Sequence, residues 1–177
     1  MVHIFNTLLK VLLLALTLYL IGSYSSSKIQ QYKDNKDFNI PISMAERERQ
    51  LTCLAKNIYF EAASEPFEGK VAVAQVTINR AESGRYPSDI CDVVYQKNVV
   101  YGRVICQFSW YCESGPRIRH NDAYKESMEV AKRVLLENFR LPSLKNAYFY
   151  HADYVSPNWK LPKITQIGRH IFYGQKV

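Results

Sequence analysis

The chain has 177 residues, of which 47% are hydrophobic and 22% are charged, with seven glycines and seven prolines. These proportions exclude a disordered chain and indicate an ordinary folded domain. The net charge of +7 would suit an anionic partner, but the lysines and arginines are scattered and no nucleic-acid-binding motif accompanies them. We therefore expect no nucleic-acid partner.

The N-terminal residues 1–22 carry one charge, Lys10, which is followed by a leucine-rich run from Val11 to Ile21. As a helix, residues 4–21 would be about 27 Å long, close to the roughly 30 Å hydrocarbon core of a bilayer. The segment is expected to be a transmembrane signal-anchor or a cleaved signal peptide, and the lack of an Ala-x-Ala site favours the anchor. The remaining chain would then be exported, either held at the periplasmic face of the inner membrane or secreted.

The polar residues 23–43 are expected to be a linker, followed by a domain over 44–177. A domain of about 130 residues has the commonest size for a single domain, and we expect a monomer.

The four cysteines form an even number, as is typical of an exported protein with disulfides. Four cysteines allow three pairings, and the sequence does not choose among them. The short loop between Cys106 and Cys112 favours that pair, which would leave Cys53 with Cys91. A zinc site of Cys106, Cys112 and His120 lacks paired C-x-x-C spacing, so neither a metal nor a cofactor is expected.

A helix is expected over residues 44–63. Ser43 and Glu46 form a capping box before it, and apolar residues then recur at helical spacing: Leu51, Leu54, Ala55, Ile58 and Ala62. Pro66 disfavours a helical Glu65, so the chain should turn there. Glu61 is thus placed in the last helical turn, at the margin of the buried face.

Three more helices and a small sheet are expected after this turn. Residues 69–82 are rich in β-branched side chains, but their length and alanines favour a helix. "PSDICDVVYQ" indicates a short helix capped by Ser88. Residues 120–139 are amphipathic, with an apolar face of Tyr124, Met128, Ala131, Val134, Leu135 and Phe139. "NAYFYHA" and "ITQIGRHIFYG" indicate strands. The expected fold is α+β, mainly helical with a small antiparallel sheet.

Three carboxylates, Glu61, Glu65 and Glu68, lie in the mostly apolar run "NIYFEAASEPFEG". Apolar surroundings disfavour the charged form of a carboxyl, so the pKa of Glu61 should rise, and an anionic Glu65 would raise it further. A carboxyl that is protonated near neutral pH can protonate the leaving oxygen of a glycosidic bond. The alternative is a structural glutamate satisfied by the backbone or a tyrosine hydroxyl, and Glu68 also suits a helix start.

The run "IYFEAASEPFEGKVAVAQVTINR" resembles the signature of the SleB/CwlJ-type cell wall hydrolases, the spore cortex-lytic enzymes. Matching runs follow in the same order: "YPSDICDVVYQ", "CQFSW", "AYFYHADYVSPNW" and "IGRHIFYG". Together they extend over residues 51–174. Ala63 and Ser64 stand where the family usually has Arg-Gly, which puts any contact made by that arginine in doubt.

The resemblance implies a lysozyme-like helical core and a peptidoglycan lytic transglycosylase. Glu61 would cut the bond between N-acetylmuramic acid and N-acetylglucosamine as the single general acid and base, giving 1,6-anhydro products. Water-using glycosidases typically need a pair of carboxylates instead.

Further side chains are expected to bind the glycan strand. "CQFSW" offers hydrogen bonds and a stacking face, or is only a disulfide-stapled loop. In "YFYHA", Tyr148 and Tyr150 should share one strand face, while His151 points the other way with Phe149 or is a satisfied core histidine. Asn79 and Arg80 are expected to brace the glutamate loop. The candidates are Tyr59, Glu65, Gln107, Ser109, Trp110, Tyr148, Tyr150, His151 and Trp159.

Three other functions compete with this hypothesis. One is a lysozyme-type muramidase that uses water. Another is a cysteine peptidase or amidase with Cys106 as nucleophile and His151 as base, which requires a free thiol. The third is a non-catalytic, membrane-tethered module that binds cell-wall glycan.

Overall fold

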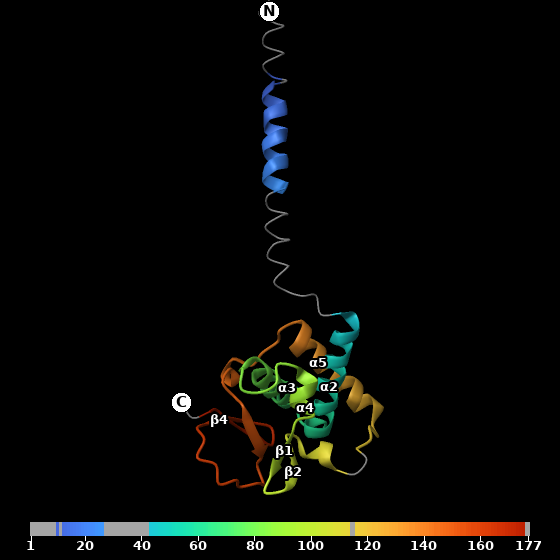
Figure 1. Ribbon diagram of the computed structural model, residues 1–177, viewed down its shortest axis with the longest axis vertical. Helices are drawn as coiled ribbons and strands as arrows, with labels where there is room; N and C mark the ends of the chain where they lie inside the picture. The colour runs from blue at the N-terminus through green and yellow to red at the C-terminus, as the bar shows by residue number, and fades with distance from the viewer. Residues whose placement is uncertain (1–9, 11, 27–42, 114–115, 176–177) are drawn as a thin grey trace, which may run out of the picture. The chain divides into compact units, whose positions relative to one another are not determined.

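The computed structural model describes residues 10, 12–26, 43–113 and 116–175 (Figure 1). Its contacts divide the chain into two units, Met1–Ser43 and Met44–Val177. Residues 12–26 of the first unit are helical. None of the helices in the described ranges has both the length and the hydropathy needed to cross a membrane. The apolar segment expected over residues 1–22 lies partly outside the described residues, and so does most of the expected linker.

The second unit is built on packed helices (Figure 1). They are α2 (Met44–Ala62), α3 (Phe67–Glu82), the short α4 (Ile90–Val94) and α5 (Asn121–Leu136). Helices α2, α3 and α5 pack against one another, and α4 packs against α2 and α3. Asp89 caps α4 by accepting a hydrogen bond from the Asp92 N–H at 3.1 Å. The expected cap at Ser88 is therefore wrong by one residue.

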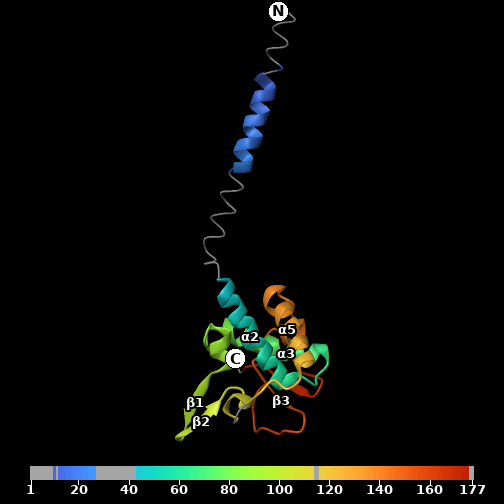
Figure 2. The same cartoon turned by 90° about the vertical axis from the view of Figure 1, so that its right-hand side faces the viewer.

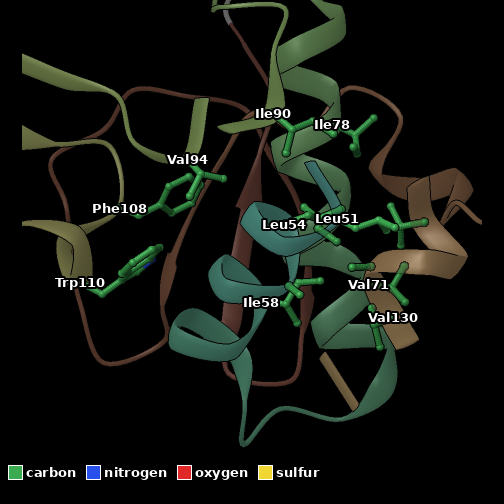
Figure 3. Packing of buried hydrophobic residues seen from close by; sticks show 14 residues of the cluster. Leu51, Leu54, Ile58, Val71, Ile78, Ile90, Val94, Phe108, Trp110 and Val130 are labelled. Atoms are coloured by element: carbon green, nitrogen blue, oxygen red, sulfur yellow. The ribbon is translucent and has the colours of Figure 1, made fainter. Parts of the chain in front are cut away.

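The hydrophobic core lies where these helices meet (Figure 3). Leu51, Leu54 and Ile58 of α2 are buried against Val71 of α3 and Val130 of α5. Every residue of α3 from 69 to 80 is buried, because α2 and α5 cover one side of the helix and the sheet covers another. A helix enclosed in this way carries apolar residues on several faces, which explains why its sequence also resembled a buried strand.

Two small antiparallel sheets complete the unit. Strands β3 (Phe149–Ala152), β5 (His170–Tyr173) and β4 (Lys163–Ile167) lie side by side in that order. Phe172 of β5 packs on Ala72 and Val76 of α3. A separate hairpin, β1 (Lys97–Val100) and β2 (Arg103–Cys106), precedes the 3₁₀ helix η1 (Ser109–Cys112), and a second 3₁₀ turn, η2 (Pro142–Leu144), precedes β3. The α+β class expected from the sequence is confirmed, although the β1–β2 hairpin was not foreseen.

Two disulfides staple the domain. Cys53 of α2 is bonded to Cys91 of α4, and Cys106 at the end of β2 is bonded to Cys112 in η1. This pairing is the one that the short loop favoured. No free thiol remains, so the cysteine-nucleophile hypothesis is wrong.

Candidate active site

A cleft of about 330 Å³ opens at the C-terminal end of α2. Side chains from five parts of the chain meet there: Glu61, Arg80, Gln107, Phe108, Ser109, Phe149, Tyr150, His151 and Trp159. Glu61 is the only acidic side chain among the described residues that line this cleft. Six of the residues singled out from the sequence are thus brought together: Glu61, Gln107, Ser109, Tyr150, His151 and Trp159.

The Glu61 carboxyl is partly buried and has one hydrogen-bond donor. Tyr150 Oη, from β3, donates to Glu61 Oε2 at 3.0 Å. Burial raises the pKa of Glu61, whereas the Tyr150 hydrogen bond and the Arg80 charge lower it and the Glu113 charge raises it. Burial is the largest of these effects, so the pKa lies above its ordinary value and the protonated form persists to higher pH than for an exposed glutamate.

Tyr150 is held in place by its own neighbours. Its ring packs edge-on against His170, with centroids 5.1 Å apart, and against Phe172 at 5.6 Å. Burial raises the pKa of Tyr150 well above its ordinary value, and the Glu61 charge acts in the same direction. Tyr150 therefore stays protonated and remains a hydrogen-bond donor to Glu61.

Arg80 also lines the cleft, whereas the sequence predicted only a bracing role for it. Its side chain is buried, and Nε donates to the Tyr148 carbonyl at 2.8 Å. The guanidinium lies over the rings of Phe108, Tyr86 and Phe149 at 5.4 to 6.0 Å. Its Nη1 is buried without a hydrogen-bond partner. A buried N–H without a partner is unfavourable, so a ligand oxygen in the cleft would be stabilised there.

The expectation that Arg80 and Asn79 brace the glutamate loop is corrected by these contacts. Asn79 Nδ2 donates to the Leu144 and Ala147 carbonyls at 2.9 and 2.8 Å. Both residues thus fix the chain that leads into β3, and thereby position Tyr150. The available signal was an arginine in the last turn of a helix rich in valine and alanine, since a buried charge needs partners.

The cleft also has an aromatic and more exposed part, formed by His151 and Trp159. The His151 ring stacks on Tyr173, and its Nε2 lies 2.9 Å from Tyr173 Oη while its Nδ1 lies 2.9 Å from the Ala152 carbonyl oxygen. Trp159 packs edge-on against His151 and Tyr173, with 43% of its surface exposed. A rigid aromatic side chain beside polar groups is well suited to stack on a pyranose ring.

The other candidates lie outside this cleft. Tyr59 is buried, and its hydroxyl accepts hydrogen bonds from the Arg119 and His120 N–H groups. Trp110 is buried, stacks on Phe60 and donates from Nε1 to Asn57 at 3.0 Å. Tyr148 precedes β3 and lines a different cavity.

The strand-face prediction for "YFYHA" needs correction. Tyr148 does not accompany Tyr150, and Phe149, Tyr150 and His151 all line the same cleft. Strict alternation fails because β3 is only four residues long and begins at Phe149.

Glu65 has a different role from the one expected. It is buried, and its Oε2 accepts a hydrogen bond from the Arg169 N–H at 3.0 Å. The carboxylate whose charge raises the pKa of Glu61 is Glu113, not Glu65. Glu65 instead joins the turn after α2 to the β4–β5 turn, where a Cβ on Gly168 would lie 1.8 Å from its Oε2. Within the described ranges, no group of three histidine, cysteine, aspartate or glutamate side chains could hold a metal ion.

The geometry defines the class of this protein: it is a compact α+β domain with one partly buried acid in an aromatic cleft. The chain belongs to the cell wall hydrolase family, whose model matches residues 64–173. The match begins three residues after Glu61.

Relatives and solved structures agree with this family. The chain is 30% identical over 136 residues to a spore cortex-lytic enzyme of Oceanobacillus iheyensis, covering 76% of this chain and 44% of the relative. It is 28% identical over 141 residues to one of Halalkalibacterium halodurans, covering 77% and 38%. The chain thus spans less than half the length of these two relatives.

Two solved structures have a similar fold. The catalytic domain of Bacillus cereus SleB has a TM-score of 0.53 and 25% identity, with 71% of this chain and 90% of that chain covered. That of the germination-specific lytic transglycosylase SleB from Bacillus anthracis has a TM-score of 0.54 and 25% identity, with 76% and 98% covered. Both are catalytic domains, and residues 44–177 of this chain likewise form a compact unit of their own.

Proposed function

We propose that this protein cleaves the glycan strands of peptidoglycan as a lytic transglycosylase, with Glu61 as its general acid and base. The observation that carries the proposal is the single acid of the cleft, partly buried and hydrogen-bonded to Tyr150. The similarity to a domain named as a lytic transglycosylase supports the same reaction.

In the first step, protonated Glu61 gives its proton to the oxygen between N-acetylmuramic acid and N-acetylglucosamine. The bond from the muramic acid C1 to this oxygen breaks, and the N-acetylglucosamine hydroxyl leaves. The ionised Glu61 then takes the proton from the 6-hydroxyl of the muramic acid, and O6 bonds to C1. The product is a 1,6-anhydro sugar, no water is consumed and Glu61 is protonated again.

The rest of the cleft is suited to hold the sugar in this reaction. Trp159 offers a ring for stacking, and Gln107 and Ser109 offer hydrogen bonds. The unpartnered Nη1 of Arg80 would donate to a sugar oxygen at the cleft floor.

The experiment that tests the proposal is a digestion of purified peptidoglycan by residues 44–177, with mass spectrometry of the soluble products. We expect anhydro-muropeptides, one water lighter than hydrolysis products, and none from Glu61→Gln. If neither protein releases fragments while both pellet with the wall, the domain is a glycan-binding module and the proposal is wrong.

A second candidate function, a water-using muramidase, is favoured by one observation. Glu113, directly after η1, is close enough for its charge to raise the pKa of Glu61. A muramidase would need Glu113 as its second carboxylate, so Glu113→Gln would abolish its activity. For the transglycosylase we expect Glu113→Gln to remain active, with the alkaline limb of its pH profile at lower pH. Hydrated reducing ends together with an inactive Glu113→Gln would establish the muramidase.

We also propose that the protein acts outside the cytoplasm, held to the inner membrane by its apolar N-terminal segment. Two disulfides suit an oxidising compartment. An alkaline phosphatase fusion at the C-terminus should be active in the periplasm. Retention of the full-length chain in carbonate-washed membranes would support the anchor, whereas a shortened, soluble protein would mean that the signal is cleaved.

A further inference from the structure

The β1–β2 hairpin exposes an unusual amount of apolar surface. It projects away from the helices (Figure 2). Tyr101 at its tip is 100% exposed, Val99 is 73% exposed and Val104 is 57% exposed, while Val100 and Ile105 are also exposed. Contiguous apolar surface of this kind marks a contact site with a protein or a membrane.

Apolar side chains occupy both faces of this hairpin. Val99 pairs with Val104, so these two share one face. Ile105 pairs with Asn98, and Val100 pairs with Arg103, so the two aliphatic side chains lie on the other face. A hairpin that docks flat on a protein needs only one apolar face. A hairpin that enters an apolar medium is surrounded by that medium, so apolar side chains on both faces are favourable.

The residue at the tip, Tyr101, has a backbone conformation that is unfavourable for a bulky side chain. Tyr101 and Gly102 form a two-residue turn with φ of 51° and 74°. Such a turn favours Asn-Gly, and a left-handed tyrosine costs about 1 kcal/mol or more. Since the Tyr101 ring is fully exposed, no contact of this ring inside the domain offsets that strain.

The charged side chains within the hairpin segment have a single sign. No aspartate or glutamate occurs from residue 93 to residue 112, whereas Lys97 and Arg103 are both exposed at the starts of the two strands. The Lys97 ammonium lies over the Tyr111 ring, 4.5 Å from its centroid. An apolar tip flanked by cations and carrying a tyrosine matches the chemistry of an anionic lipid surface.

We propose that the β1–β2 hairpin inserts its tip into the interface of an anionic phospholipid bilayer. Aliphatic side chains on both faces favour lipid over glycan, which stacks on aromatic rings, and over a second copy of this chain. The contact does not depend on the proposed cleavage reaction.

The contact would also place the cleft close to the bilayer. Gln107, which lines the cleft, follows β2 directly, and its N–H donates to the Gln96 carbonyl at 2.9 Å across the base of the hairpin. The Cys106–Cys112 disulfide fixes the same base. A bound hairpin would therefore direct the cleft toward glycan strands near the membrane.

Co-sedimentation with lipid vesicles tests this proposal. Residues 44–177 are used, so that the N-terminal segment makes no contribution. We expect the domain to pellet with vesicles of phosphatidylglycerol and phosphatidylethanolamine, less so with phosphatidylcholine alone, and less as salt is added. A double Val99→Ser, Val104→Ser variant should bind at least about tenfold more weakly.

Matched variants separate lipid contact from loss of folding. Tyr101→Asn gives the favoured Asn-Gly turn, so it should keep or raise the stability of the domain while weakening lipid binding. Val155→Ser removes an exposed apolar side chain elsewhere and should leave binding unchanged. Glu61→Gln should bind lipid normally even though we expect it to cleave nothing, so the two proposals can fail independently.

Three outcomes would overturn the inference. One is the absence of vesicle binding, and another is equal binding by the wild type and the hairpin variants. The third is self-association of the domain that Tyr101→Asn abolishes without any lipid binding, which would make the hairpin a contact between copies of this chain.

Discussion

The two disulfides close loops of very different length, and this difference predicts how much each one stabilises the domain. Cys53 and Cys91 are 38 residues apart, whereas Cys106 and Cys112 are six apart. The loop-closure relation gives about 4 kcal/mol for the long loop and about 2 kcal/mol for the short one at 25 °C. Replacing Cys53 and Cys91 by alanine also leaves space in a buried site, which increases the loss there.

Urea unfolding of residues 44–177 without reductant measures both losses. We expect the double Cys53→Ala, Cys91→Ala variant to lose about twice as much free energy of unfolding as the double Cys106→Ala, Cys112→Ala variant. An equal or larger loss in the short-loop variant would refute the loop-length argument.

The loss of peptidoglycan-cleaving activity should follow the opposite order, with the larger loss in the Cys106→Ala, Cys112→Ala variant. The Cys106–Cys112 disulfide closes a short loop that contains Gln107 and Ser109, which line the cleft. The Cys53–Cys91 disulfide joins α2 to α4, and neither of its cysteines lines the cleft. At a temperature where both variants are folded, the short-loop variant should release fewer muropeptides per molecule. A normal rate in that variant would show that η1 holds its position without the disulfide.

Three further predictions concern single residues. Tyr150→Phe removes the hydrogen bond that stabilises ionised Glu61, so the alkaline limb of the pH–activity profile should move to higher pH; an unmoved limb would contradict the assigned contact. Gly168→Ala, at φ +57° and against the Glu65 carboxylate, should lower the free energy of unfolding by more than about 1 kcal/mol, and by more than Gly84→Ala, where φ is +68° and the space is open. Burial lowers the pKa of His170, so on acidification the unfolded state binds a proton at this residue before the folded state does. The free energy of unfolding should therefore fall as the pH drops below about 6.5. A His170→Gln variant with the same acid dependence in urea unfolding would disprove this.

Local patterns predicted the helices that have one buried face. Helix α2 follows the spacing of Leu51, Leu54 and Ile58, and α5 follows its own apolar stripe. The β1–β2 hairpin was missed because its turn is Tyr101-Gly102 rather than Asn-Gly, and because valines on both faces give no alternation. Helix α3 is buried from residue 69 to residue 80, and it was predicted from its length and its alanines rather than from a difference between faces.

The site was harder to predict, because it depends on contacts between distant parts of the chain. The environment of Glu61 includes Tyr150, which lies 89 residues later in the chain, and Arg80 of α3. The sequence of α3 does not predict that the Arg80 charge acts on Glu61. Glu65 was expected to act on Glu61 because it is only four residues away. Helix α2 ends at Ala62, which agrees with the turn predicted before Pro66, and after this turn the Glu65 carboxylate contacts the distant Arg169 N–H instead.

The opposing influences on Glu61 fit the two demands of the proposed reaction. Burial alone would hold the proton on the carboxyl and make its loss in the first step unfavourable. Tyr150 and Arg80 act against burial, because both stabilise the carboxylate that this step leaves behind. The remaining upward shift of the pKa keeps the acid form present before cleavage and makes the carboxylate basic enough to accept the proton of the 6-hydroxyl. One carboxyl can serve as acid and then as base only when its pKa lies between these limits, and both groups that oppose burial reach Glu61 from outside its own helix.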